Sequence, residues 1–368
     1  MPPQDVDSKD AAGVPEDARE AADAREAAPA PSARTRLQDL FALGPVIGLA
    51  LVVLVFAATC PAQFRSFYNA KIVVTHTVIV GIAALGMTFV IISGGIDLSV
   101  GSLIALATVV TATVLNHGNA TLNALAVVGL GDADVSLLQP LLAVTAGIGA
   151  CALCGLLNGV LSTKLRIVPF IVTLGMMQIA RGLAKRIGHE QTVVTPENWL
   201  QDLMNVDPTP GWLVFAPGVW LMLLLLGLTY VVLRHTVFGR YVFAVGSNER
   251  TARLCGVRVD LCRIAIYTLS GGFAGVAGLM QYANLTVGDP TAAVGMELDV
   301  IAAVVIGGGS LAGGEGSAVG SLIGALIMAV LRNGCSMLGV PNYIQNIIVG
   351  SIIIGAVALD QLKHRLRG

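Results

Sequence analysis

The chain has 368 residues, of which 55% are hydrophobic and 12% are charged, and its formal net charge is −1. A soluble domain usually has about 25% charged residues, so this composition excludes an ordinary soluble protein and indicates a membrane protein. The near-zero net charge gives no basis for nucleic-acid binding. Long apolar runs without regular alternation favour membrane-spanning helices over a β-barrel.

Residues 1–38 are predicted to form a disordered cytoplasmic tail rich in alanine and acidic residues. The hexapeptide DAREAA occurs at 17–22 and again at 23–28, and few large apolar residues are present to drive a packed core. The basic start and short apolar stretch of a secretory signal are lacking. We therefore expect the first apolar run to act as an uncleaved anchor.

Residues 39–362 are predicted to be a transmembrane domain, followed by a short basic cytoplasmic tail at 363–368. The fold class is all-α and polytopic, with about ten transmembrane helices and a range of nine to eleven. Each crossing needs about 20 mainly apolar residues. TLNALAVVGL (121–130) is too short to span and is expected to be a re-entrant or external helix. The predicted spans are 41–59, 72–92, 98–115, 137–161, 167–184, 212–233, 264–283, 298–307, 317–332 and 344–360.

The Lys and Arg residues predict the orientation of these spans. With the N-terminal tail inside, alternation through ten spans places most of the 22 Lys and Arg residues on the cytoplasmic side. Both termini and the segment 234–263 are therefore expected to be cytoplasmic.

The stretch IISGGIDLSVGSLIALA (91–107) places an acid between apolar runs. We expect SGGID to be a short cytoplasmic turn in which Asp97 caps the third span, because a carboxylate suits a helix N-terminus. VGSLI (100–104) returns at 319–323, again after a glycine-rich patch. This repeat predicts two related halves of the kind that transporters show, with a chance match in a glycine- and leucine-rich chain as the alternative. The residues assigned to the turn and cap are Gly94, Gly95, Asp97 and Ser99.

The spans carry almost no ionisable residues in their cores, and His76 and Arg181 are the exceptions we considered. Ion-coupled carriers keep such residues for function, so this scarcity argues against that class without removing it. We expect a neutral His76 hydrogen-bonded between helices, with a lone proton relay as the alternative. Arg181 lies near the end of its span, where it can snorkel.

No motif in the sequence indicates an enzyme. A phosphate-binding loop GxxxxGK[ST] is absent, since none of the five lysines follows a glycine, and HExxH and GxSxG are absent too. Cys151 and Cys154 form a CxxC inside an apolar run, where we expect packing residues rather than a zinc or redox pair. No metal, cofactor or catalytic residue is predicted, and the chain is not expected to bind ATP through such a loop.

Glycines four residues apart predict close helix crossings, because small residues let backbones approach in lipid. Intramolecular packing is favoured here over a dimer contact. GGGSLAGGEGS (307–317) is expected to be a tight turn between helices. The spaced glycines are Gly155 with Gly159, Gly271 with Gly275, and the series Gly316, Gly320 and Gly324.

SNERTARLCGV (247–257) in the cytoplasmic segment predicts a short helix. Ser247 or Asn248 can cap it, Glu249 favours its positive end, and Gly256 can terminate it. Such a helix between spans is either part of a basic inside loop or a docking surface for a cytosolic partner.

Four motifs in register resemble the permease subunits of bacterial ABC-type monosaccharide importers, the ribose and xylose permeases. They are GGIDLSVGS, GSNERTARLCGV, ELDVIAAVVIGGGSLAGGEGSAVGSLIGALI and NGCSMLGVPNYIQNIIVGSIII. The likeness runs from about residue 70 to 362. It implies a homodimer in the bacterial cytoplasmic (inner) membrane, working with a cytosolic ATP-binding subunit and an extracytoplasmic sugar-binding protein.

The resemblance also implies that 247–257 is the helix that couples the permease to the ATP-binding subunit. Family members have alanine where this chain has Thr251, a small departure. The residues implied in coupling are Ser247, Asn248, Glu249, Arg250, Ala252, Arg253, Gly256 and Val257.

The remaining candidates concern the outer face and the path of the solute. Asp289, Glu297 and Asp299 are candidate contacts for the binding protein, with helix capping as the alternative for the last two. The solute itself is not identified by the sequence, and branched-chain amino acids or a sugar-like signal molecule stay open. Polar residues that either line the path or bond neighbouring helices are Ser93, Asn158, Gln178, Asn333 and Gln345.

Overall fold

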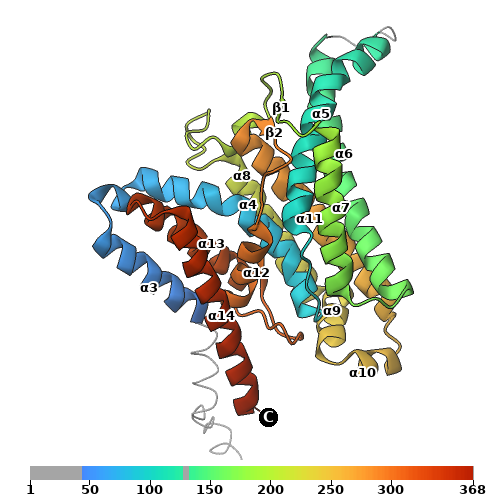
Figure 1. Cartoon of the computed structure of the whole chain (residues 1–368), viewed down its shortest axis with the longest axis vertical. Coiled ribbons are helices and arrows are strands. Elements are labelled where there is room, and N and C mark those ends of the chain that lie inside the picture. The colour runs from blue at the N-terminus through green and yellow to red at the C-terminus, as the bar shows by residue number, and fades with distance from the viewer. Residues whose placement is uncertain (1–43, 127–131, 368) are drawn as a thin grey trace, which may run out of the picture. The chain divides into compact units, whose positions relative to one another are not determined.

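The computed structural model describes residues 44–126 and 132–367, and these are almost entirely helical. Their strands are one antiparallel pair, in which β1 (Val193–Val194) bonds β2 (Val287–Gly288). Figure 1 shows this pair at one end of the helical bundle and α9 and α10 at the other. The predicted tail at 1–38 lies outside the described residues.

Each predicted span coincides with a helix. Residues 121–126 of the predicted re-entrant stretch continue α5, and 127–130 lie outside the described residues. The helices are α3 (Gly44–Thr59), α4 (Phe67–Ile92), α5 (Val100–Ala126), α6 (Asp132–Lys164), α7 (Pro169–Ile187), α8 (Pro217–His235), α11 (Val259–Leu285), α12 (Met296–Ile306), α13 (Ala318–Met337) and α14 (Asn342–Arg367).

Length and composition support membrane insertion. Among the described helices, α4, α8, α11, α13 and the Leu138–Lys164 part of α6 are long and apolar enough to cross a membrane. Shorter apolar helices are α3 and the stretches Val100–Asn116 and Asn342–Ala358. The chain is thus an all-α polytopic membrane protein. At 11 residues, α12 is too short to cross alone, since a crossing needs about 20.

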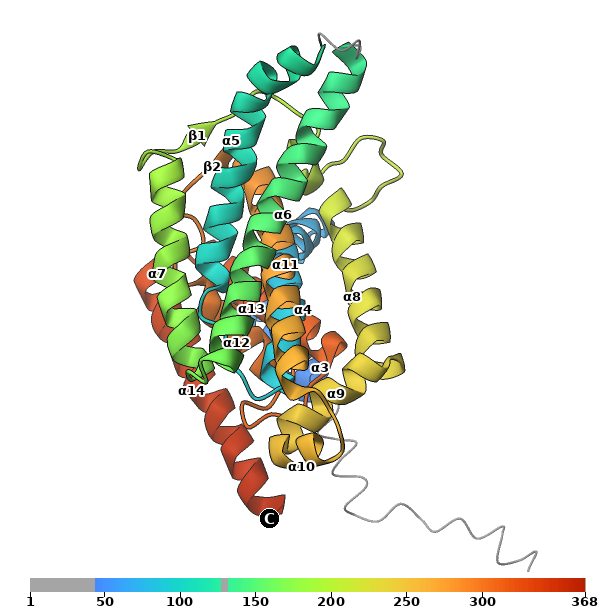
Figure 2. The ribbon, with the colours of Figure 1, turned by 90° about the vertical axis from the view of Figure 1, so that its right-hand side faces the viewer.

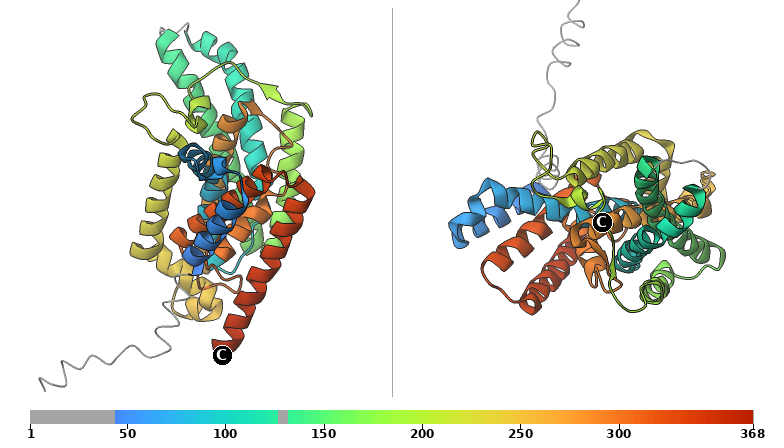
Figure 3. Two further views of the ribbon diagram at one scale, coloured as in Figure 1. Left: turned by 90° about the vertical axis from the view of Figure 1, so that its left-hand side faces the viewer. Right: turned by 90° about the horizontal axis from the view of Figure 1, so that it is seen from above.

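The helices form two groups that meet along α4 and α11. Helices α5 and α6 pack on α11, and α7 packs on α5 and α6. Helices α12 and α13 pack on each other and on α4, with α3 against α13 and α14 against α12. Figure 3 shows α3, α13 and α14 on one side of the bundle and α5, α6 and α7 on the other.

The spaced glycines lie at the predicted close crossings except Gly316, which precedes α13 and lies against the Ile92 side chain. A Cβ added at Gly155 or Gly271 would overlap the backbone of the facing helix, so α6 and α11 meet backbone to backbone. A Cβ at Gly320 or Gly324 would overlap carbonyl oxygens of Gly307 and Ala303, at and before the end of α12. These glycine faces pack against other helices of the same chain, as the preference for intramolecular packing predicted. Buried Cys151 lies in the first crossing and donates to the carbonyl of Leu103.

A non-helical segment enters the bundle before α12. The backbone N–H of Asp289 donates to Thr108 Oγ1 at 3.2 Å, and further along, the Ala293 carbonyl lies against Gly101 near the start of α5. The guanidinium of Arg181 donates to the carbonyls of Pro290 and Ala292, at 3.0 and 2.7 Å, instead of snorkelling. Irregular backbone at membrane depth is tolerated where protein buries it or where it lines a cavity.

Candidate functional site

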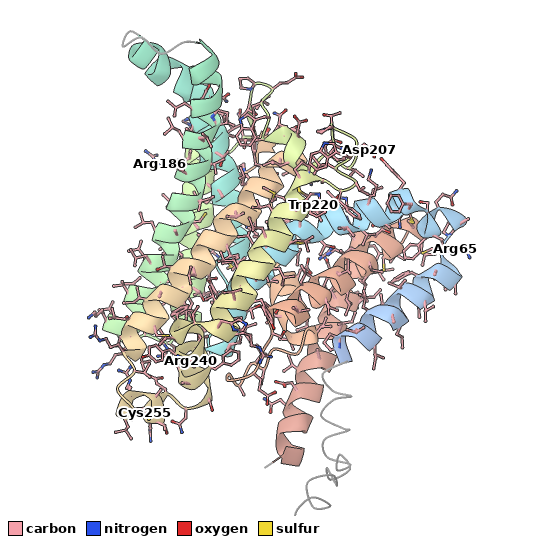
Figure 4. All side chains as sticks on the ribbon, turned by 180° about the vertical axis from the view of Figure 1, so that it is seen from behind. Arg65, Arg186, Asp207, Trp220, Arg240 and Cys255 are labelled. Atoms are coloured by element: carbon pink, nitrogen blue, oxygen red, sulfur yellow. The ribbon has the colours of Figure 1, made fainter. Side chains whose placement is uncertain are left out.

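The short helix predicted at 247–257 is present as α10 (Glu249–Leu254), directly after α9 (Val237–Ser247). Asn248 is its N-cap, accepting a hydrogen bond from the N–H of Thr251 at 3.0 Å. Gly256 follows with a φ of +82°, a left-handed conformation that glycine adopts without strain. Figure 2 shows α10 at the tip of the bundle, and Figure 4 places Cys255 at the opposite end from Asp207.

Four charged side chains brace α10 against the first turns of α11, and we name Glu249, Arg253, Asp260 and Arg263 the Glu249 cluster. Arg253 bonds Glu249 at 3.0 Å and Asp260 at 2.6 Å, and Arg263 bonds Glu249 at 2.7 Å. Burial alone would raise the pKa of Glu249, but the hydrogen bonds and charges of Arg253 and Arg263 outweigh it and lower that pKa. The cluster fixes the angle at which α10 stands.

The outward face of α10 is left open. Ala252 is buried, whereas Leu254 is 88% exposed and Arg250 is exposed as well. A groove of about 530 Å³ separates the Glu249 cluster from the α6–α7 turn, where Arg166 and Pro169 line it. An exposed leucine beside basic side chains is a surface suited to a protein partner.

Glycines join the base of α10 to the last turn of α4 and to the turn between α12 and α13. Gly246, near the end of α9, is so close to the last turn of α4 that an added Cβ would overlap the carbonyl oxygen of Ile92. The same carbonyl accepts a hydrogen bond from the N–H of Gly314 at 2.8 Å. The glycine-rich stretch 307–317 is thus the turn between α12 and α13, and it also meets α4 and α9. We name Ile92, Gly246, Gly313 and Gly314 the glycine junction.

Asp97 is fully buried between α4 and α5. Its Oδ1 accepts from the N–H of Ser99 at 2.9 Å and from Ser99 Oγ at 2.5 Å, and its Oδ2 accepts from Ser270 Oγ of α11 at 3.2 Å. Asn158 of α6 donates to Ser99 Oγ at 3.1 Å. Asp97 therefore holds Ser99, the residue before α5, and links Ser99 to α11. The prediction that Asp97 caps the helix is wrong, because its carboxylate does not bond the N–H groups of the first turn of α5.

A cavity of about 540 Å³ lies between α4, α11, α12 and α13. Its α11 residue Gln281 is about 33 Å along the helix from Val259, at 1.5 Å per residue, so the cavity and α10 lie towards opposite ends of the bundle. The first turn of α12 forms one wall, as in transporters whose sites are built on interrupted helices. The polar lining residues are His76, Gln281, Asn284, Asp299, Arg332, Asn333 and Ser336.

An ion pair lies in the wall of this cavity. Arg332 of α13 bonds Asp299 of α12 at 2.6 Å, and the Asp299 side chain is 8% exposed while that of Arg332 is 42% exposed. Asn333 donates to Asn69 of α4 at 3.1 Å. Asp299, considered above as an outer-face contact, thus faces inward.

Several lining side chains have no hydrogen bond to the described residues. Gln281 is 8% exposed and unpartnered, and the exposed His76 and Asn284 are unpartnered too. His76 therefore lacks the interhelical hydrogen bond that we expected of it. The cavity offers polar groups to whatever fills it.

The other candidates are spread over several places. Ser93 bonds its own helix at the Val90 carbonyl, and Gln345 donates to the Val340 carbonyl away from the cavity. Gln178 lines a smaller hollow of about 300 Å³ beside Arg181. Asn333 alone of the five candidate path residues lines the large cavity.

The two other outer-face candidates lie outside the large cavity. Glu297 lines the same smaller hollow as Gln178, and Asp289 accepts a hydrogen bond from Thr291, close to β2.

Sequence reasoning missed Gln281, Asn284 and Arg332. Asp299 and Arg332 stand at the start of the eighth and the end of the ninth predicted span, which are antiparallel neighbours. Opposite charges at adjoining ends of such spans were the available signal for the pair. No comparable signal marked Gln281 or Asn284, because amides in an apolar helix more often form hydrogen bonds between helices.

The family model described as "Branched-chain amino acid transport system / permease component" matches residues 69–357. The ribose import permease protein RbsC of Escherichia coli strain K12 is 38% identical over 314 residues, which are 85% of this chain and 92% of that protein. RbsC of Bacillus subtilis strain 168 is 36% identical over 329 residues, 87% and 93% of the two chains.

A third relative is the fructose import permease protein FrcC of Rhizobium meliloti, 35% identical over 322 residues, covering 86% of this chain and 84% of that protein. No solved structure matches the chain. The resemblance to sugar permeases that four motifs indicated is thereby confirmed. The chain belongs to the branched-chain amino acid transport system / permease component family.

Proposed function

We propose that this chain is the membrane-spanning subunit of an ATP-driven importer and forms the path of a monosaccharide across the bacterial cytoplasmic membrane. The observation that carries the proposal is the braced and exposed α10, which stands at the end of the bundle opposite a polar cavity. The similar ribose and fructose import permeases support a sugar as the solute.

In this proposal α10 docks on a cytosolic ATP-binding subunit. Leu254 and Arg250 face outward, while the Glu249 cluster holds the helix on α11. A partner that moves α10 would therefore move the start of α11. The sequence contains no phosphate-binding loop, so ATP hydrolysis is assigned to that partner.

Two connections carry movement from α10 into the bundle. Helix α11 has 27 residues, about 40 Å at 1.5 Å per residue, and runs from the Glu249 cluster past Ser270 to the cavity. The glycine junction links α9 to α4 and to the turn before α13. Both connections reach helices that line the cavity.

The proposal includes two further partners. An extracytoplasmic binding protein would deliver the sugar at the end of the bundle that carries β1, β2 and Asp289. A second copy of the chain would complete the importer, as the resemblance implies. Both termini and α10 would lie in the cytoplasm.

The test is uptake into proteoliposomes that contain the permease, its ATP-binding subunit and its binding protein. Labelled ribose, fructose and arabinose should accumulate in an ATP-dependent manner. Leu254→Asp should abolish uptake and weaken binding of the ATP-binding subunit about tenfold or more, because a charge replaces an exposed apolar contact.

The matched control is Val214→Asp, which changes an exposed valine in the loop before α8, at the other end of the bundle. It should bind the ATP-binding subunit as tightly as the wild type does. Uptake that persists without ATP, or that follows a proton gradient, would favour an ion-coupled carrier. Normal uptake by Leu254→Asp would remove α10 as the docking element.

A further inference from the structure

The amide of Gln281 is unexplained by packing. It lies in the last turns of α11, is 8% exposed, and has no hydrogen bond to the described residues. Its amide is not sealed inside the protein, because it lines the cavity. A polar group at such a place costs free energy unless water or a ligand bonds it. Gln281 is therefore placed to bond what fills the cavity.

Arg332 offers a second set of donors to the same space. One of its terminal nitrogens bonds Asp299, whose side chain is nearly buried, while the Arg332 side chain stays 42% exposed. A guanidinium has five N–H donors in a rigid plane, so one bond to a carboxylate leaves others available. Asp299 is a positioning residue here, because it fixes the direction in which Arg332 faces the cavity.

The charge of the lining indicates the class of ligand. Asp299 and Arg332 neutralise each other, and His76 is the other titratable residue that lines the cavity. An amino acid would bring an ammonium group, and the carboxylate of the lining is already bonded to Arg332. An uncharged solute with many hydroxyl groups can use the amide and the guanidinium without leaving a charge unpaired. A cavity of about 540 Å³ is also within the range of small-molecule sites, roughly 300 to 1,000 Å³.

We propose that this cavity is a solute-binding site of the permease itself, in which Gln281 and Arg332 bond the hydroxyl groups of an uncharged monosaccharide. The inference rests on the proposed function for its choice of sugar. It goes further, since it assigns direct recognition of the solute to named residues of this chain rather than to a delivering protein alone.

The experiment measures thermal unfolding of the purified permease in nanodiscs, without partners, in the presence of ribose, fructose, arabinose or leucine. A ligand that binds only the folded state raises Tm, by about 2 °C or more when its concentration is several-fold above Kd. At least one of the sugars should raise Tm and leucine should not. In Gln281→Met the apparent affinity for that sugar should fall about tenfold, as expected for a lost hydrogen bond.

The matched control is Gln345→Met, which replaces a buried glutamine outside the cavity that donates to the Val340 carbonyl at 2.9 Å. Methionine keeps the unbranched shape of the side chain in both variants. Gln281→Met should unfold at or above the wild-type temperature without sugar, because no bond within the protein is lost. Gln345→Met should unfold earlier but keep the full response to sugar.

The outcomes separate this inference from the proposed function. A sugar response equal in Gln281→Met and the wild type, a response to leucine, or no response to any of the three sugars would each overturn the inference. ATP-driven uptake of sugar tests the proposed function independently, because a permease that only passes the sugar on would show uptake without any shift in Tm.

Discussion

At the α10 end every member of the Glu249 cluster is paired, whereas in the cavity Gln281 and His76 have no partner among the described residues. Backbone contact differs as well, since Gly246 touches the Ile92 carbonyl while the cavity leaves about 540 Å³ open. Close packing with paired charges suits an element that passes on movement. Open polar groups suit an element that binds and releases a ligand.

The largest effect is expected from breaking the glycine junction. Gly246→Val would push a side chain into the carbonyl of Ile92 and should cost about 3 kcal/mol or more, since overpacking without room to relax is strongly destabilising. Gly227→Val is the control, because nothing lies within 4 Å of a Cβ at that helical position. Thermal unfolding in detergent compares the two, and equal loss of stability would show that α9 has room to move.

Asp97 should give the next largest effect, and the kind of substitution decides its size. Asp97→Ala leaves Ser99 and Ser270 without their buried partner, at a cost of about 1–3 kcal/mol. Asp97→Asn keeps an acceptor for Ser99 and gives Ser270 a donor, so the free energy of unfolding should fall much less. If both variants are equally destabilised, the charge itself is needed and the hydrogen-bond account of Asp97 is wrong.

A smaller effect is expected from the Glu249 cluster. The pKa of Glu249 is lower in the native state than in the unfolded chain, because Arg253 and Arg263 bond its carboxylate. Its contribution is therefore present above the unfolded pKa and is lost as pH falls through the native pKa. Glu249→Gln should remove that contribution at neutral pH, by about 1 kcal/mol or less because the cluster is partly exposed.

Limited proteolysis around α10 between pH 7 and pH 3 measures this change. The wild type should become more sensitive only in the acidic part of the range, and Glu249→Gln should be equally sensitive throughout. A wild type whose cleavage rate does not change with pH would show that the cluster does not hold α10 in place.

The helices could be predicted because membrane spans are determined by local composition. Each predicted span coincides with a helix where its residues are described, and Gly324 lies at the crossing that its spacing indicates. The cap of α10 was equally local, since Asn248 needs only the N–H of Thr251, three residues on. Such features depend on neighbours within one or two turns.

The cavity depended instead on how distant helices meet. Asn333 and Gln345 are both amides in the last two helices, yet one lines the cavity and the other bonds the Val340 carbonyl. Asp299 looked like an exposed helix cap until α13 placed Arg332 against it. The position of α12 inside the bundle could not be predicted either. It depends on the non-helical segment before α12, and hydropathy does not indicate where such a segment bends.

The most direct test of the account uses Cys255, the one exposed cysteine of the six, all of which lie in the described residues. It follows α10 immediately, so the wild-type permease in nanodiscs should react with a maleimide at this position. We predict that a saturating concentration of the ATP-binding subunit slows this labelling about tenfold or more, as expected for a site buried at an interface. Labelling at an unchanged rate, with the ATP-binding subunit shown to be bound, would contradict the assignment of α10 as the docking element.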